Sequence, residues 1–152
     1  MSKAERIFQL AQEVANLYNL LQARRVGSGD RYTREVIDHL KSLVIQELGH
    51  EVTNQLISQA DHPPVDFWLA EEQTILEVEF SFWSSVPVLE REVFKALLAQ
   101  EAGHAVRQLV LIGDPGLAQH CEAPLQRSLI AWAELHHHLR IQIWELQEKP
   151  TP

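Results

Sequence analysis

Two glutamates interrupt an otherwise apolar run in the stretch TILEVEF, residues 74–80. Side chains alternate along a strand, so Glu77 and Glu79 would share one face of a sheet. Asp66 precedes Glu77 by eleven positions, across a short turn, and would lie opposite or diagonal to the pair. Carboxylates buried together repel one another, so the cluster needs a cation or arginine partners. Hard oxygen ligands of this kind suit Mg²⁺ or Mn²⁺.

A divalent cation held by these three carboxylates would make a site for phosphodiester hydrolysis. The cation would polarise the phosphate and lower the pKa of the attacking water. The alternative is a half-solvated sheet, with both glutamates in water and the alternate apolar residues in the core. Ile75 shares the glutamate face, which indicates that this face is not plainly polar.

Two basic residues follow the glutamates on a predicted helix. Arg91 and Lys95 stand four positions apart, so they would share one side of that helix and could hold a phosphate or stabilise developing charge. The alternative is a solvated helix face on which Lys95 pairs with Glu92. The apolar stripe of the helix is formed by other residues: Leu89, Val93, Phe94, Ala96, Leu97 and Leu98.

The hydrophobic periodicity predicts the elements that would position these side chains. A glycine or proline marks several of their ends, as at Gly49, Pro87 and Gly103. Helices are expected at about residues 3–25, 32–48, 87–102 and 124–138, and strands at about 51–58, 65–70, 74–82, 106–112 and 141–146.

This order predicts a mixed α/β sheet in which a three-strand meander connects through a crossover helix to further strands, with helices on both faces. The chain is expected to form a single domain over residues 1–152. Its parts are an N-terminal helix in residues 1–25, a core in residues 32–112, and a C-terminal helix and strand in residues 113–152.

The element order, with PPVD at residues 63–66 and EVE at residues 77–79, resembles the restriction-endonuclease-like superfamily of PD-(D/E)XK nucleases. The resemblance covers residues 32–112. It implies that Asp66 is the first metal-binding aspartate and Glu77 the second acidic ligand. Glu79 stands where the family usually has lysine, and some members with glutamate there are active. In other members the lysine has moved to the following helix, where Lys95 would match it.

The same resemblance implies an auxiliary acidic residue on the helix before the first strand. Glu35 is the expected match, with Asp38 and Glu47 as competing choices. The basic residues around this helix form a weak electropositive patch or, alternatively, a solvated face: Arg24, Arg25, Arg31, Arg34 and Lys41.

Composition limits the class of protein. The chain has 152 residues, a formal net charge of −8 and a single cysteine, so it has no internal disulfide and no thiolate zinc site. Net acidity argues against broad capture of a polyanion, although a bound cation would invert the local sign. No apolar run is long enough for a membrane span, and the N-terminus lacks a signal-peptide pattern, so a cytoplasmic location is expected.

Other residues capable of chemistry have simpler explanations. The run His136–His138 would end a helix, where histidines suit the helix dipole and adjacent positions do not converge on a metal. The tryptophans Trp68, Trp83, Trp132 and Trp144 are expected in the core or at an interface, with base stacking as the alternative.

The sequence therefore predicts a Mg²⁺-dependent nuclease acting on DNA. Asp66, Glu77 and Glu79 would bind the metal, and Lys95 would assist as a cation. A chain close to a bare core would need a homodimer or a larger complex for sequence specificity. The competing hypothesis is a nuclease-like fold that does not cleave and acts as a binding or scaffold module. A third possibility is an α/β domain of another family with a solvated glutamate pair.

Overall fold

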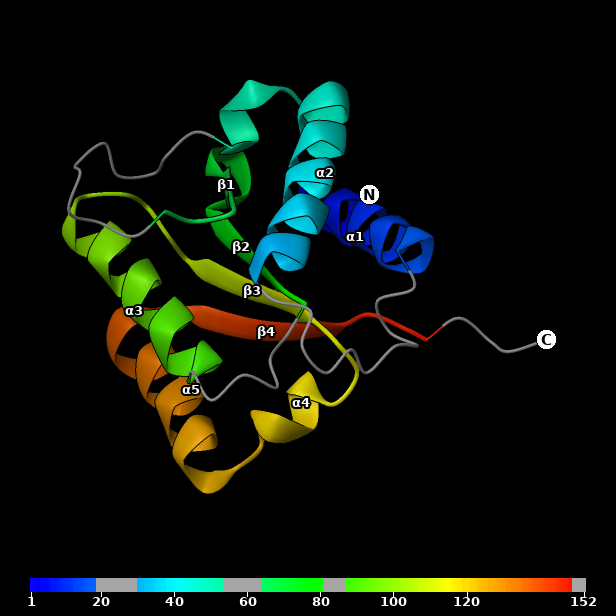
Figure 1. The fold of residues 1–152 in the computed structure, drawn as a ribbon. Helices are drawn as coiled ribbons and strands as arrows, with labels where there is room; N and C mark the ends of the chain where they lie inside the picture. The colour runs from blue at the N-terminus through cyan, green and yellow to red at the C-terminus, as the bar shows by residue number, and fades with distance from the viewer. Residues whose placement is uncertain (19–29, 54–63, 81–86, 149–152) are drawn as a thin grey trace.

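A computed structural model describes residues 1–18, 30–53, 64–80 and 87–148, with backbone only for residues 30–33 (Figure 1). Helices and strands alternate over most of the chain. The helices are α1 (Lys3–Leu17), α2 (Asp30–Leu48), α3 (Val88–Glu101), α4 (Leu117–His120) and α5 (Pro124–His137), with short 3₁₀ turns η1 (His50–Thr53) and η2 (Ala70–Glu72). The strands are β1 (Phe67–Leu69), β2 (Thr74–Glu79), β3 (Gln108–Gly113) and β4 (Arg140–Glu145).

The four described strands form one mixed sheet in the order β1-β2-β3-β4. β1 and β2 are an antiparallel hairpin, in which Phe67 pairs with Leu76. β2, β3 and β4 run parallel, so α3 connects β2 to β3 as a crossover, and α4 and α5 connect β3 to β4. The expected mixed α/β class and its parallel crossover are confirmed.

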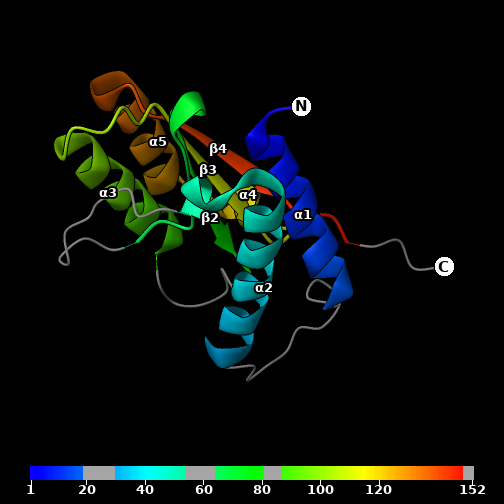
Figure 2. The same cartoon turned by 90° about the horizontal axis from the view of Figure 1, so that it is seen from above.

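Helices cover both faces of this sheet (Figures 1 and 2). On β2, Leu76 and Val78 join a core that contains residues of α1 and α2. Ile75 points the other way, into a second core built with α3 and α5. The alternation of side chains therefore turns Glu77 and Glu79 toward α3, on the same face as Ile75.

The predicted first strand of the meander, residues 51–58, is wrong over the part of it that the structure describes. Residues 51–53 belong to the 3₁₀ turn η1, while residues 54–58 lie outside the described residues. Gly49 ends α2 with a φ of 94°, and the Thr53 hydroxyl donates to the His50 carbonyl oxygen at 3.0 Å, so local hydrogen bonds favour a turn here. The described part contains a two-strand hairpin, not a three-strand meander.

Two smaller expectations also differ, and one short helix was not expected. α1 ends at Leu17 with Tyr18 as its C-cap, whereas a helix to Arg25 was expected; residues 19–25 lie outside the described residues. Phe94 was expected in the core but is exposed on α3. The turn after β3 contains the short helix α4. This helix begins after Gly116, whose backbone is in the left-handed conformation.

Gly113, at the end of β3, permits a close approach of β2 and α4. A Cβ at this position would lie 2.5 Å from Leu117 Cδ2 and 3.2 Å from the Glu79 carbonyl oxygen. Leu117 is fully buried and has little room to move. Gly113→Ala should therefore lower the free energy of unfolding by about 1–3 kcal/mol, measured by urea denaturation.

Leu117→Ala supplies the control for this clash. If the alanine methyl presses on Leu117, the double variant should lose less stability than the sum of the two single variants. Additive losses would contradict a direct clash.

Candidate functional site

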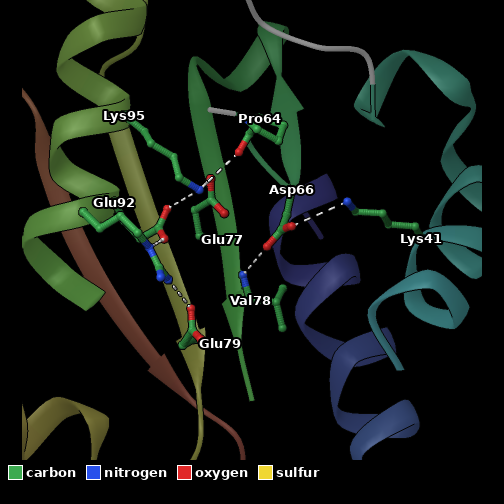
Figure 3. A network of polar contacts seen from close by, with 9 residues as sticks. Lys41, Pro64, Asp66, Glu77, Val78, Glu79, Glu92 and Lys95 are labelled. Atoms are coloured by element: carbon green, nitrogen blue, oxygen red, sulfur yellow. Dashed lines mark hydrogen bonds and ion pairs between the residues drawn. The ribbon is translucent and has the colours of Figure 1, made fainter. Parts of the chain in front are cut away.

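Asp66 lies immediately before β1 and next to Glu77 of the neighbouring strand. Since Phe67 pairs with Leu76, the next position of the same register places Asp66 opposite Glu77. The Val78 amide donates to Asp66 Oδ2 at 2.9 Å, and Lys41 Nζ of α2 lies 3.6 Å from Asp66 Oδ1 (Figure 3). The aspartate is thus held between β2 and α2.

Glu77 is buried, with 4% of its surface exposed, and receives a cation from α3. Lys95 Nζ lies 3.3 Å from Glu77 Oε1 and 2.8 Å from Glu92 Oε2, and it donates to the Pro64 carbonyl oxygen at 3.1 Å (Figure 3). Only 12% of the Lys95 side chain is exposed. Lys95 pairs with Glu92, as the alternative expected, but it is not solvated, because its ammonium group reaches into the carboxylate cluster. Arg91 is exposed and pairs with its neighbour Glu92, which agrees with that alternative.

Glu79 connects to the same cluster through Arg91. The Arg91 guanidinium donates to Glu79 Oε2 and to Glu92 Oε1, both at 2.8 Å. Glu92 is 2% exposed, and its two oxygens are shared between Arg91 and Lys95. We call Asp66, Glu77, Glu79 and Glu92, with Lys41, Arg91 and Lys95, the carboxylate network.

Sequence reasoning did not identify Glu92 as a site residue. It lies one position after Arg91, and its i, i+3 spacing to Lys95 was read as a surface pair. Its burial depends on how α3 packs on the sheet, which the helical period alone does not specify.

The pKa values in this network reflect burial and crowding of negative charge. Burial raises the pKa of Glu77 well above its ordinary value; the charges of Asp66 and Glu92 and a hydrogen bond with Asp66 raise it further, against the opposing effect of Lys95. Burial also raises the pKa of Glu79, although Arg91 opposes the shift. The site therefore favours a bound proton or an added cation.

Lys95 stays charged in this setting. Burial acts to lower the pKa of its ammonium group, but the Glu77 and Glu92 carboxylates outweigh burial, and the net shift is upward. A lysine with a raised pKa is a poor general base at neutral pH. It is suited instead to stabilising negative charge.

The three expected metal ligands do not all face one another. Asp66 and Glu77 face one another, whereas Glu79 is turned to Arg91 (Figure 3). Among the residues that the structure describes, no three His, Cys, Asp or Glu side chains are grouped so that they could hold a metal ion. The donor chemistry of Asp66 and Glu77 still fits Mg²⁺, which takes one or two carboxylates and keeps several waters.

Asp114 is a further buried carboxyl, in the turn that follows β3. It is 8% exposed, and its Oδ1 has no hydrogen-bond partner in the described ranges. Burial, and then the charge of Glu79, raise the pKa of Asp114 to about 7. The signal available in the sequence was its position just after a parallel strand, where ligand sites often form.

Asp114→Asn should stabilise the protein more at pH 8 than at pH 5. The folded state holds a proton on Asp114 up to about pH 7, whereas the unfolded state releases it near pH 4. The folded state thus binds more protons in this window, and wild-type stability falls as pH rises through it. Asparagine removes this loss, which is at most about 4 kcal/mol.

Urea denaturation of wild type and variant at both pH values measures the difference. Asp38→Asn, at an exposed position of α2, is the matched control and should show no such pH dependence. A stability gain from Asp114→Asn that is equal at pH 5 and pH 8 would contradict the raised pKa.

The other expected site residues lie outside the carboxylate network as described. Glu35 and Asp38 are exposed on α2, and Glu47 accepts a hydrogen bond from Arg6 Nε at 2.7 Å, which ties α2 to α1. Of the predicted electropositive patch, Lys41 contacts the network and Arg34 is exposed. Arg24 and Arg25 lie outside the described residues, and the Arg31 side chain is not described.

Three of the described tryptophans contact a neighbouring aromatic or histidine ring, and one of them, Trp132, is also 43% exposed. Trp144 packs edge-on against Phe8 with ring centroids 5.6 Å apart, and Trp68 packs against His104 at 6.5 Å. His137 lies beside Trp132, with ring centroids 4.7 Å apart. Trp83 lies outside the described residues.

Comparison with protein-family models, curated proteins and solved structures finds no match for this chain. The nuclease resemblance thus stays a prediction from the sequence. None of the described helices is both long and apolar enough to cross a membrane.

Proposed function

We propose that the protein is a Mg²⁺- or Mn²⁺-dependent phosphodiesterase that hydrolyses DNA, with a restriction-endonuclease-like core. The position of Lys95 is the observation that supports this function best. The family's usual lysine is replaced by Glu79, and Lys95 instead brings an ammonium group to 3.3 Å from Glu77 Oε1 from the following helix. Asp66, just before β1, lies opposite Glu77 in the register of the hairpin.

Asp66 and Glu77 would hold the cation, with Glu79 as a further acidic group nearby. A bound Mg²⁺ supplies Lewis-acid polarisation of the phosphate and a water of lowered pKa. Lys95 stabilises the negative charge that develops on the phosphate oxygens, because its raised pKa keeps it protonated. Arg91 bridges Glu79 and Glu92 and so orients both carboxylates.

A second function is favoured by the same contacts. Lys41, Arg91 and Lys95 already pair with the carboxylates, so the network is largely neutralised without a metal. A nuclease-like fold that does not cleave and acts as a scaffold would need no more than this. A solvated glutamate pair, the third possibility, is wrong for Glu77 because that side chain is buried.

Mn²⁺ titration by calorimetry, followed by incubation with supercoiled plasmid and with single-stranded DNA, tests the enzyme against the scaffold. The enzyme should bind Mn²⁺ and nick DNA, and Glu77→Ala should lose both properties. Glu101→Ala, at an exposed position of α3, is the control and should keep both. No heat of binding and no nicking by the wild type would refute the enzyme and leave the scaffold.

A further inference from the structure

Strand β4 is an open edge of the sheet in the described part of the chain. It is the last strand in the sheet order and pairs with β3 on one side only. Residues 141–145 are half-buried, whereas residues 109–113 of β3 are all buried. The outer side of β4 therefore has no described strand beside it.

Alternate residues of β4 direct their backbone groups outward from this edge. The Arg140 amide donates to the Arg107 carbonyl oxygen, just before β3, at 2.9 Å. In a parallel ladder every second residue bonds to the same neighbour, so the even-numbered residues of β4 face β3 and the odd-numbered ones face outward. The outward N–H and C=O groups of Ile141 and Ile143 have no hydrogen-bond partner among the described residues. Their natural partner is another strand.

The two edges of the sheet are built differently. β1, at the other edge, has three residues and begins three positions after Pro64. β4 has six residues, RIQIWE, with no lysine or proline and with its charges only at the two ends. Proteins usually blunt an exposed edge with a short strand, proline or lysine, because an open edge pairs with other chains. β4 has none of these protections, which indicates that a strand covers it.

A row of polar side chains ends at this edge and indicates which strand that is. Thr74 Oγ1 donates to Gln108 Oε1 at 3.5 Å, and Gln108 Nε2 donates to Gln142 Oε1 at 2.9 Å, so the row crosses from β2 to β4. The half-buried Gln142 has no further hydrogen-bond partner in the described ranges. When a second β4 pairs antiparallel about a two-fold axis at Gln142, the two Gln142 amides lie opposite, and each can donate to the other.

The same axis pairs the rest of the strand. Ile141 of one copy lies opposite Ile143 of the other, and each such pair exchanges two hydrogen bonds between the outward backbone groups. Both isoleucines pack against the core beneath α3 and α5, so the pairing extends an apolar face. On the opposite face Arg140 lies across from Trp144, where its guanidinium can stack on the indole. Each contact occurs twice, as an isologous interface requires.

Helix α5 points a charged flank toward the same neighbour. α3 and α5 both connect parallel strands on one face of the sheet, so they run in the same direction. Glu90 of α3 stands six positions before the buried Ala96 and accepts a hydrogen bond from Gln126 of the next helix, α5, at 3.0 Å. Arg127 stands six positions before the buried Ala133 of α5. It therefore points in the corresponding direction, away from α3 and past the edge at β4.

Arg127 and Glu134 are placed to meet across the axis. They are two turns apart on one flank of α5, both are exposed, and neither forms an ion pair with another described residue. Their midpoint lies about 10 Å along α5 from His137, at about 1.5 Å per residue. Gln142 lies about 10 Å along β4 from Leu139, at about 3.3 Å per residue. The axis through Gln142 thus passes this midpoint, so Arg127 of one copy meets Glu134 of the other, twice.

We infer that the protein forms a homodimer in which antiparallel pairing of β4 joins the two sheets into one and places the two α5 helices side by side. β4 lies at the edge of the sheet, and α5 covers the face beside it (Figures 1 and 2). The interface uses no residue of the carboxylate network, so this inference is independent of the proposed function. One strand pair and one helix pair make a small interface, so dimerisation should depend on concentration.

Sedimentation equilibrium over a range of concentrations tests the dimer. The wild type should dimerise, and Gln142→Glu should raise the dimer Kd at least about tenfold, because two carboxylates would face each other at the axis. The new carboxylate still accepts from Gln108, so the monomer should fold, which melting curves establish. Gln46→Glu, at an exposed position of α2, adds the same charge and should leave Kd unchanged. A wild type that is monomeric throughout, or equal effects of the two variants, would overturn the inference.

Charge exchange and cross-linking test the arrangement itself. Arg127→Glu should weaken the dimer, and adding Glu134→Arg should restore it. Gln142→Cys should give a disulfide-linked dimer on mild oxidation, because opposite residues of this kind have Cα atoms about 4.5 Å apart, which a disulfide can span. Wild type should not, because its Cys121 is buried and burial raises the thiol pKa to about 11. Failure of both restoration and cross-linking would exclude this interface even if a dimer exists.

Discussion

Glu77→Gln should abolish the proposed metal-dependent DNA cleavage and at the same time raise the melting temperature of the metal-free protein. Loss of the proposed ligand removes several kcal/mol of transition-state stabilisation, so nicking should fall at least about a hundredfold. Stability should rise because glutamine keeps the volume and removes a buried charge that Asp66 and Glu92 oppose.

The stability gain should grow with pH. The folded-state pKa of Glu77 lies well above 4.5, so the folded protein holds more protons than the unfolded chain from about pH 4.5 upward, and wild-type stability falls across that range. Thermal denaturation of both proteins in chelator at pH 5 and pH 8 measures this. Glu101→Gln, the control, should change neither the rate of DNA nicking nor the melting temperature. A variant that loses stability at pH 8 would show that Lys95 compensates Glu77 fully and that no cation is needed.

Lys95→Met should lower the free energy of unfolding by about 3–5 kcal/mol at pH 7, the usual result of removing one partner of a buried ion pair. The ammonium lies between Glu77 and Glu92, both of which would stay buried without a cation at these oxygens. At pH 4 the loss should be smaller because the pKa of Glu77 is raised well above its ordinary value, so this carboxyl is protonated there. Urea denaturation at the two pH values provides the measurement.

Two companion variants identify the cause of that loss. Adding Glu92→Gln to Lys95→Met should recover part of the stability, since it removes one of the two buried carboxylates that Lys95 neutralised. Arg91→Met should cost less than Lys95→Met, because Arg91 is the more exposed cation. Lys95→Met with less than about 1 kcal/mol of destabilisation would mean that the lysine contributes nothing to the network.

Periodicity predicted most of the fold. α2, α3 and α5, and the strands β2, β3 and β4, lie close to their expected positions because each has a regular apolar pattern. A glycine or proline also marks an end of α2, α3, α5 and β3. The 3₁₀ turn at His50–Thr53 and the four-residue α4 were missed, since both are too short to show a period.

The site was predictable only in part. Asp66 and Glu77 could be paired from the sequence because a short hairpin fixes their register. Glu92 and Asp114 could not be identified, because a charged residue is expected in water and only tertiary packing buries these two. Phe94 shows the opposite: the apolar stripe of α3 predicts that it is buried, but the packing of the helix on the sheet leaves it exposed to solvent.

The division of the network among the β1–β2 hairpin, α3 and Lys41 of α2 has a thermodynamic consequence. Strand β2 provides Glu77 and Glu79, and Asp66 precedes β1, while α3 provides Lys95, Arg91 and Glu92. A divalent ion that binds Glu77 must compete with the lysine that secures α3 to the sheet. By linkage, metal affinity and the local opening equilibrium of α3 are reciprocally coupled, so this helix would report occupancy of the site through the exchange rates of its amide hydrogens.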